Sequence, residues 1–332
     1  MDFKVFYDCD ADLKIIREKK VAVIGYGSQG HAHALNLHNS EVDVVVGLPS
    51  TSKSREKAEA AGLKVKSPDA AAKWADVVMM LVPDEVMAEI YEKDVEPNLE
   101  SGNFLAFAHG FNIHFAKITP PKGIGVFMVA PKGPGHMVRR QYEQGKGVPC
   151  LVACLDKDNK DIFKLGLSYA KAIGGTKAGV FATTFKEETE TDLFGEQTVL
   201  CGGLSGLIKA GYETLVKNGY SPVMAYFECV HEIKLIVDLI YEGGLANMRS
   251  SISNTAEFGD YQTGAKIIDD SVKKRMQEVL ESIQKGEFAE NWLAEHRSGA
   301  TAFKETRSLE TKLPLEQVGK DLREKMSFAS LT

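Results

Sequence analysis

The sequence has few of the features that mark disulfide-stabilised, zinc-binding or nucleic-acid-binding proteins. It holds five cysteines, an odd number, and none of them forms a CxxC pattern, which argues against a disulfide framework and a zinc site. We interpret them as reduced packing residues. Lys and Arg (40) do not outnumber Asp and Glu (46), and no basic run is interleaved with aromatic residues, so nucleic acid is not an expected partner.

Long apolar runs are also missing. Runs such as VVMMLV are far too short to cross a bilayer, and the first twenty residues are charged throughout rather than patterned as a leader peptide. No membrane partner is expected, and a cytoplasmic location is predicted. With 332 residues and 44% apolar composition, the chain can bury large cores and is expected to form two domains that act on a small molecule.

The first half of the chain alternates short apolar runs with helical patterns. The runs lie at residues 21–25, 42–47, 75–83, 103–110, 124–133 and 148–155, and they predict a parallel sheet covered on both faces. After about Thr183 such runs cease, and apolar positions recur at helical spacing. The predicted architecture is an α/β Rossmann-type domain over residues 1–183, followed by an all-α domain over residues 184–329.

The segment VAVIGYGSQGHAHALNL contains a GxGxxG pattern between an apolar strand and a helix. Its glycines, Gly25, Gly27 and Gly30, allow a tight turn and the close approach of a pyrophosphate to backbone N–H groups. Because the strand, the helix and a second strand follow in order, the pattern predicts a dinucleotide site. A purely structural glycine turn is the alternative.

The loop after the second strand, GLPSTSKS, is where such folds contact the ribose of the dinucleotide. It offers the hydroxyls of Ser50, Ser52 and Ser54 together with Lys53, but no arginine. Hydroxyls and a lysine can hold a 2′-phosphate, although less firmly than an arginine fork. A solvated polar loop without a binding role is the alternative.

Polar residues follow three of the other predicted strands. Asp84, His109 and Lys132 each stand where an apolar run ends, and open α/β sheets bind ligands beyond the carboxyl ends of their strands. Each residue alone is weak evidence, since a single histidine or lysine is often structural. Together they are what the floor of a binding site would contain.

Two pairs of acids stand four residues apart in helical segments, Asp192 with Glu196 and Glu228 with Glu232. Like charges at this spacing repel, and the second pair continues an apolar stripe, so a solvated outer face is not expected. Buried carboxylates need a cation or a proton, and a set without His or Cys suits Mg²⁺ or Mn²⁺. Surface acid pairs, or acids paired with Lys and Arg, are the alternative.

Six motifs of a known family occur in order along nearly the whole chain: GYGSQGHAHALNL, AHGFNIHF, PKGPGHMVRR, ETETDLFGEQTVLCGG, FECVHEIKLIVDLIYEGG and SISNTAEFGDY. The chain resembles short-form ketol-acid reductoisomerase, the acetohydroxyacid isomeroreductase of valine and isoleucine synthesis. The resemblance implies a Rossmann domain and a knotted all-α domain. It also implies NADP(H) or NAD(H), two Mg²⁺ ions per site, and a homo-oligomer in which the dimer is the smallest active unit.

The resemblance further implies roles for single residues. Asp192 would bridge the two metal ions with Glu196 beside it, the neighbouring subunit would supply Glu228 and Glu232, and Ser253 would bind substrate. The expected catalytic residues are His109, Lys132 and Glu232. The expected cofactor-binding residues are Gly25, Tyr26, Gly27, Ser28, Gln29, Gly30, Pro49, Ser50, Ser52, Ser54, Asp84, Glu85, Val86, Met87 and Gly135.

The implied substrate is a small keto-hydroxy acid, 2-acetolactate or 2-aceto-2-hydroxybutyrate. An alkyl group would migrate from C2 to C3, and hydride would then reduce the new C2 ketone, with the metal ions stabilising the developing charge. Glu232 would handle a proton beside the metal ions, and Lys132 would give electrostatic support. Most members of the family carry an arginine for the 2′-phosphate where this chain has Pro49, so the choice between NADPH and NADH stays open.

Two other functions remain possible from the residues alone. A 3-hydroxyacid-type dehydrogenase would need a catalytic lysine on a helix and no set of four acids, and its activity would survive chelation of metal. A non-catalytic nucleotide sensor would keep the glycine pattern and dispense with the acids. Neither explains why the acid spacing occurs twice.

Overall fold

The computed structural model describes residues 4–326. Contacts divide the chain into two compact units between Thr191 and Asp192, and each unit is described by itself. The division falls within helix α9 (Phe185–Gly195). The boundary predicted after Thr183 lies eight residues earlier (191 − 183 = 8) and stays a prediction. The predicted limit at residue 329 lies outside the described residues.

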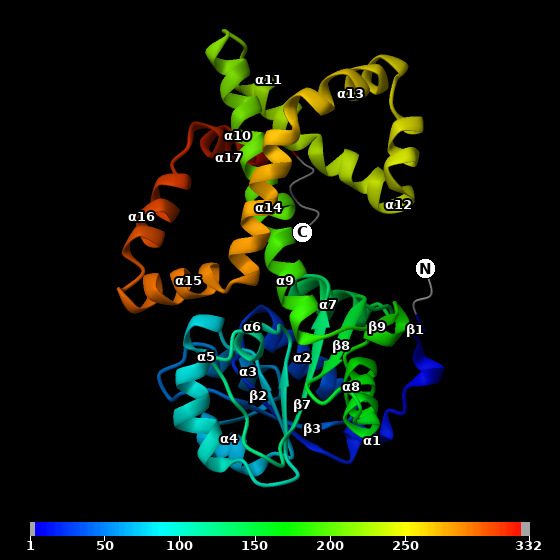
Figure 1. The fold of residues 1–332 in the computed structure, drawn as a ribbon, viewed down its shortest axis with the longest axis vertical. Helices are drawn as coiled ribbons and strands as arrows, with labels where there is room; N and C mark the ends of the chain where they lie inside the picture. The colour runs from blue at the N-terminus through cyan, green and yellow to red at the C-terminus, as the bar shows by residue number, and fades with distance from the viewer. Residues whose placement is uncertain (1–3, 327–332) are drawn as a thin grey trace. The chain divides into compact units, whose positions relative to one another are not determined.

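A nine-stranded sheet forms the middle of the first unit (Figure 1). Its spatial order is β1-β9-β8-β7-β6-β5-β2-β3-β4. The strands are β1 (Val5–Phe6), β2 (Lys20–Ile24), β3 (Asp43–Gly47), β4 (Lys64–Lys66), β5 (Val77–Met80), β6 (Phe104–Phe107), β7 (Gly125–Pro131), β8 (Cys150–Cys154) and β9 (Val180–Ala182). Each of the six predicted apolar runs coincides with one of these strands, which confirms the α/β prediction.

The prediction of a wholly parallel sheet is wrong at two strand pairs. β8 runs antiparallel to β7, and β1 runs antiparallel to β9. Pro131 at the end of β7 pairs with Cys150 at the start of β8, so the chain between them returns to the same edge of the sheet. Without a crossover to the opposite edge, the two strands must be antiparallel.

Helices cover both faces of the sheet because alternate residues of a strand point to opposite faces. Val21 and Val23 of β2 join one buried cluster with α2 and α8, while Ala22 and Ile24 join a second cluster with α4 and α5. The helices are α1 (Lys14–Arg17), α2 (Ser28–Asn39), α3 (Arg55–Ala60), α4 (Pro68–Trp74), α5 (Asp84–Ile90), α6 (Phe111–His114), α7 (Gly135–Glu143) and α8 (Lys160–Ala172). A π-helical segment, η2 (Tyr91–Val95), continues α5, and the 3₁₀ turns are η1 (Asp8–Asp10), η3 (Glu96–Asn98) and η4 (Gly175–Lys177).

The described part of the second unit is helical, as predicted. Its helices are α10 (Gly202–Lys217), α11 (Pro222–Tyr226), α12 (Ile233–Ser251), α13 (Asn254–Ile267), α14 (Asp270–Gln284), α15 (Glu287–Arg297), α16 (Thr301–Glu310) and α17 (Pro314–Lys325). Two π-helical segments, η5 (Glu196–Leu200) and η6 (Phe227–His231), continue α9 and α11. The fully buried cluster here is small, with four residues: Tyr212, Ala225, Tyr226 and Leu315. Within residues 4–326, no helix is both long and apolar enough to cross a membrane.

Candidate active site

Four neighbouring strands bring the predicted residues of the first unit to one edge of the sheet. β2, β5, β6 and β7 pair in parallel, and the chain beyond their carboxyl ends carries Gly25, Asp84, His109 and Lys132. Carboxyl ends of parallel strands share one edge, which is where open α/β sheets bind ligands. The candidate site of the first unit is built along this edge.

The glycine turn after β2 has the geometry that a dinucleotide requires. Gly25 adopts a φ of 104°, and a Cβ at this position would overlap the carbonyl oxygen of Leu81, so only glycine fits. Gly27 immediately precedes α2, and the buried Gly30 lies in its first turn. The backbone N–H groups that open α2 can therefore receive a pyrophosphate. Tyr26 is half-buried, and burial raises the pKa of its phenol.

Two predicted cofactor residues use their side chains inside the protein. The Gln29 amide donates to the Gly133 carbonyl at 2.9 Å, and the Ser28 hydroxyl accepts from the Gly135 N–H at 3.1 Å. These contacts join the turn after β2 to the segment after β7. The Gln29 amide donor is thus engaged within the protein, whereas the Ser28 hydroxyl keeps its own O–H as a donor for a phosphate.

The loop after β3 is open to solvent at its start. Pro49 and Ser50 are exposed, whereas Ser52 and Ser54 are half-buried. The Ser52 hydroxyl accepts from the Ser54 N–H at 3.2 Å, which fixes the backbone between them. The loop therefore offers hydroxyls and no guanidinium beyond β3.

The first turn of α5 carries the predicted residues Asp84 to Met87. Glu85 and Val86 are half-buried, but Met87 is only 5% exposed and packs in the second buried cluster. The buried amide of Asn112 lies against this turn and reaches the Met87 sulfur at 3.4 Å. The Met87 side chain is therefore part of the core, and a cofactor contact there would involve its backbone.

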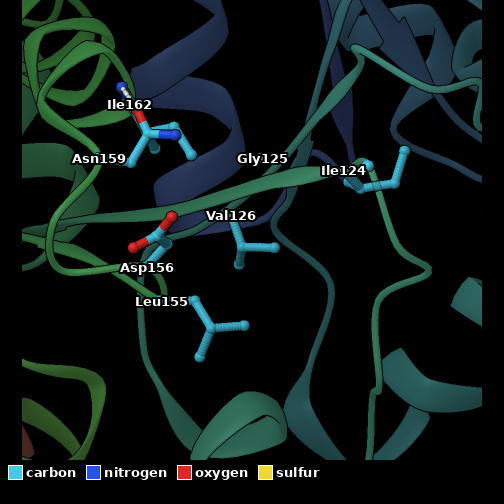
Figure 2. A pocket seen from close by; sticks show the side chains of 8 residues that line it. Ile124, Gly125, Val126, Leu155, Asp156, Asn159 and Ile162 are labelled. Atoms are coloured by element: carbon cyan, nitrogen blue, oxygen red, sulfur yellow. Dashed lines mark hydrogen bonds between the residues drawn. The ribbon is translucent and has the colours of Figure 1, made fainter.

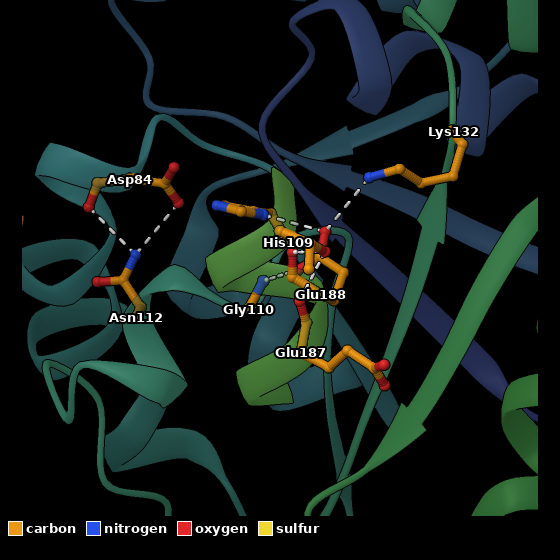
Figure 3. A network of polar contacts seen from close by, with 8 residues as sticks. Asp84, His109, Gly110, Asn112, Lys132, Glu187 and Glu188 are labelled. Carbon is orange, nitrogen blue, oxygen red and sulfur yellow. Dashed lines mark hydrogen bonds and ion pairs between the residues drawn. The ribbon is translucent and has the colours of Figure 1, made fainter. Parts of the chain in front are cut away.

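Asp84 is the titratable group of this turn. The Asn112 amide donates to its carbonyl oxygen at 3.2 Å and to its Oδ1 at 3.4 Å (Figure 3). Burial raises the pKa of the Asp84 carboxyl to about 6, and the nearby His109 offsets part of this rise. Asp84 therefore changes protonation close to neutral pH, which is unusual for an aspartate.

His109 and Lys132 converge on a buried acid, Glu188 of α9 (Figure 3). Glu188 Oε1 lies 3.1 Å from His109 Nδ1 and 3.9 Å from Lys132 Nζ, and Oε2 accepts from the Gly110 N–H at 2.9 Å. A carboxylate only accepts hydrogen bonds, so the His109 proton belongs on Nδ1. Nε2 is then the nitrogen that can accept a proton.

Glu188 was not among the predicted site residues. It is 2% exposed, and its neighbour Glu190 lies 3.2 Å from His114 Nε2, whose pKa is lowered by burial. The signal was present in the sequence, because Glu188 precedes Asp192 by the same four residues that separate Asp192 from Glu196. Extending the acid spacing by one turn would have found it.

Each acid pair of the second unit includes a residue in a π-helical turn, although Asp192 itself lies in α9. Glu196 opens η5, where the Cys201 N–H donates to the Glu196 carbonyl, and Glu228 lies in η6, where the Glu232 N–H donates to the Phe227 carbonyl. These bonds join residues five apart, whereas an α-helix joins residues four apart. The prediction of helical segments is confirmed, but the turns at Glu196 and Glu228 are π-helical, and turns of this kind occur frequently at functional sites.

The expectation that the second acid pair avoids a solvated face is wrong for a single chain. Glu196, Glu228 and Glu232 are exposed, and Asp192 is half-buried. Among residues 4–326, no group of ligating atoms within 4.8 Å of one another combines Asp192 with Glu228 or Glu232. Ser253 is also exposed and caps α13 by accepting from the Ala256 N–H at 3.2 Å.

Two cavities of the first unit lie away from these residues. One of about 440 Å³ is lined by Gly125, Leu155, Asp156 and other residues (Figure 2), and the second, of about 430 Å³, shares part of its wall. Gly125 begins β7 and Leu155 follows β8, which runs the other way. The cavities therefore lie at the amino edge of the parallel strands, opposite the candidate site.

Two family models match most of the chain. Residues 15–179 match the acetohydroxy acid isomeroreductase NADPH-binding domain, and residues 185–328 match the ketol-acid reductoisomerase C-terminal domain. A solved structure of an NADH-preferring ketol-acid reductoisomerase from an uncultured archaeon is 45% identical, with 98% of this chain and 99% of that chain covered and a TM-score of 0.94.

More distant structures share the fold alone. A semialdehyde dehydrogenase NAD-binding protein from Cupriavidus necator has 20% identity and a TM-score of 0.61, over 80% of this chain and 99% of that one. A pyrroline-5-carboxylate reductase from Coxiella burnetii has 14% identity and a TM-score of 0.58, over 80% and 98%. The two family models and the 45% identical structure agree: the chain belongs to the ketol-acid reductoisomerases, oxidoreductases that isomerise and reduce acetohydroxy acids with a nicotinamide cofactor in branched-chain amino-acid synthesis.

Proposed function

We propose that two copies of this chain share each active site, in which Asp192 and Glu196 of one copy and Glu228 and Glu232 of the other hold two Mg²⁺ ions. The observation that carries the proposal is the exposed stripe that runs from α11 through η6 to the start of α12. Glu228 and Glu232 are exposed, and so are their apolar neighbours Met224 (52%) and Leu235 (53%). An exposed stripe of this composition favours contact with a second chain.

The donor set fits the proposed metal ions. Carboxylate oxygens are the ligands that Mg²⁺ prefers, and within residues 4–326 neither Glu228 nor Glu232 forms an ion pair with Lys, Arg or His. When bound, the ions would polarise the C3 carbonyl and lower the pKa of the C2 hydroxyl of 2-acetolactate or 2-aceto-2-hydroxybutyrate, and the nicotinamide would supply hydride. Glu232 would accept the proton of the C2 hydroxyl.

The residues of the first unit would bind and orient the substrate and cofactor. His109 Nε2 can take or give a proton, because Glu188 holds Nδ1 as a donor. The Lys132 ammonium adds positive charge beside Glu188 at 3.9 Å. Ser253, a residue of the second unit, would bind the substrate through its hydroxyl, which caps α13. The buried Glu188 excludes water from one side of His109 and fixes the ring.

We propose that the cofactor site discriminates weakly between NADH and NADPH. Pro49 offers no charge to a 2′-phosphate, and Arg55, the next guanidinium along the chain, donates to the Leu48 carbonyl at 2.9 Å and lies 3.7 Å from Glu59. The arginine is thus engaged within the protein. The NADH preference of the 45% identical archaeal enzyme is consistent with this site. A cytoplasmic location accords with five free cysteines.

Co-expression of two inactive variants tests the shared site. Asp192→Asn and Glu228→Gln chains, each inactive alone, are expected to form mixed dimers in which one site carries both changes and the other carries neither. With random assembly, roughly a quarter of all sites should be intact by two-fold symmetry. Turnover of 2-acetolactate should recover to about that fraction of the wild-type rate.

A matched pair of variants supplies the control. Asp192→Asn and Glu196→Gln both alter acids assigned to the same chain, so every site in their mixed dimers carries one change and no activity should return. Equal recovery by both pairs, or none by verified mixed dimers of the first pair, would show that the four acids are not divided between chains as proposed.

A further inference from the structure

Gln29 occupies a variable position of the glycine pattern, between Gly27 and Gly30, where dinucleotide binding requires no particular side chain. Its amide is nevertheless fixed. Nε2 donates at 2.9 Å to the carbonyl oxygen of Gly133, the residue that directly follows Lys132. The turn that would receive the pyrophosphate therefore contacts the peptide bond next to the lysine of the candidate site.

The segment after β7 is held against this turn at a second point. The Gly135 N–H donates to the Ser28 hydroxyl at 3.1 Å, and a Cβ on Gly135 would overlap the Ser28 carbonyl oxygen. On the opposite side, the Lys132 N–H donates to the Pro149 carbonyl at 2.8 Å. The backbone of Lys132 is thus fixed from β8 on one side and from α2 on the other.

Packing of the side chain does not explain why an amide is present at position 29. The Gln29 Oε1 atom is buried and has no hydrogen-bond partner among the described residues, and an unsatisfied buried acceptor is unfavourable. A methionine of similar length would fill the same space without the unpaired Oε1, but it would take the donor away from the Gly133 carbonyl. The feature that distinguishes glutamine here is its N–H donor, and that donor is used on Gly133.

We infer that Gln29 is a positioning residue for Lys132: through the Gly133 carbonyl, the dinucleotide turn sets where the Lys132 ammonium lies, 3.9 Å from Glu188. The inference rests on the role proposed for Lys132. It also links cofactor binding to the position of the lysine, because the same first turn of α2 would receive the cofactor and align Lys132. Small displacements of an aligned group lower rates strongly.

A double-mutant cycle tests this inference in the full-length enzyme with Mg²⁺. Gln29→Met should lower kcat about tenfold, while the Kd of NADH, measured by fluorescence titration, stays within about twofold. In a Lys132→Met background, Gln29→Met should cause no further loss, because the lysine through which it acts is gone. Gln144→Met, the same change at an exposed glutamine, is the control and should leave kcat unchanged.

Gln29→Glu adds a readout that a packing role would not produce. A carboxylate cannot donate to the Gly133 carbonyl, but a protonated carboxyl can. Relative to wild type, this variant should regain activity as the pH falls, and it keeps the shape of glutamine if the methionine variant folds poorly.

The outcomes distinguish a failure of the inference about Gln29 from a failure of the role proposed for Lys132. A loss from Gln29→Met that persists in the Lys132→Met background, or that follows a weaker Kd for NADH, would overturn the inference and leave the role of Lys132 standing. Full activity of Lys132→Met alone would instead overturn the role proposed for the lysine.

Discussion

The two units of the chain differ in how many of their apolar and charged side chains are buried or paired within one chain. In the Rossmann unit, two buried clusters cover both faces of the sheet, and His109 and Lys132 both contact Glu188. In the helical unit one buried apolar cluster has four residues, while Glu228 and Glu232 are exposed. If the metal site is shared as we propose, folding of one chain completes the nucleotide half, whereas the other half needs a second copy of the chain.

The exposed apolar residues show the same difference. Of the large hydrophobic side chains that are exposed, most belong to the helical unit, including Tyr241 at 90% and Phe258 at 68%. Monomeric proteins rarely leave such side chains uncovered over a contiguous area. The comparison therefore predicts that changes in the helical unit affect assembly and chemistry, whereas changes in the Rossmann unit affect folding and cofactor choice.

The largest effect should come from Asp192, the first residue of the helical unit. Asp192→Asn should lower turnover by at least about 100-fold and weaken Mg²⁺ binding, because a metal site loses a charged ligand. NADH binding, which belongs to the Rossmann unit, should stay close to the wild-type Kd. Steady-state kinetics and titration calorimetry with Mg²⁺ measure the two effects.

Asp238→Asn is the matched control, since Asp238 is a partly exposed acid of the same unit that pairs with Lys234. It should keep wild-type turnover. Full activity in Asp192→Asn would show that Asp192 is not a metal ligand. It would also contradict the prediction that changes in the helical unit affect the chemistry.

The next effect concerns the buried polar groups of the Rossmann unit. His33 is fully buried with Nδ1 3.0 Å from the Tyr169 hydroxyl, and burial lowers its pKa from 6.5 to about 3. The unfolded state binds a proton in this range that the folded state does not. The contribution of His33 to the free energy of unfolding is therefore fully present above pH 6.5. It falls as the pH decreases toward 3, by up to about 1.4 kcal/mol per pH unit.

Urea unfolding at pH 7 and pH 5 measures this slope. His33→Gln starts from lower stability at pH 7, since the Tyr169 contact is changed, but it should lose about 2 kcal/mol less than wild type between the two pH values. His38→Gln alters an exposed histidine of the same helix and should keep the wild-type slope. Parallel slopes for wild type and His33→Gln would contradict a buried, neutral imidazole.

The smallest effect should come from the exposed loop after β3. Pro49→Arg adds a guanidinium near the expected 2′-phosphate and should shift preference toward NADPH about tenfold, which is about 1.4 kcal/mol. The ratio of kcat/KM for NADPH and NADH measures it. Pro49→Gln adds length without charge and should not shift the ratio. A wild-type preference for NADPH of several orders of magnitude would show that the serines already hold the phosphate.

Much of the fold follows from sequence pattern. Six strands carry apolar runs of four residues or more, and periodicity finds these. β1, β4 and β9 have two or three residues each, too few to show a pattern. The direction of β8 depends on which edge the chain returns to after β7, and this is decided by packing of distant segments rather than by the strand itself.

The site was predictable where one residue type has one physical use. Gly25 could be assigned from the glycine pattern because the turn needs a backbone conformation that favours glycine. The structure shows this conformation as a φ of 104°. Glu188 could not be assigned a contact, because its partners His109 and Gly110 lie 79 and 78 residues away. Exposure of Glu228 was also unpredictable, since an apolar stripe has the same pattern whether its own chain or another covers it.

The π-helical turns at both acid pairs have a consequence for how this enzyme can change over evolution. Each π turn holds one residue more than the α-helical turn it replaces, so deleting one residue from η5 or η6 would restore α-helix at little local cost. The helix beyond the deletion would keep its register, because one full turn replaces another, but the side chains inside the turn would point in other directions. Glu196 and Glu228 sit inside these segments. The number of residues in each turn, and not only their identity, is therefore expected to be under selection.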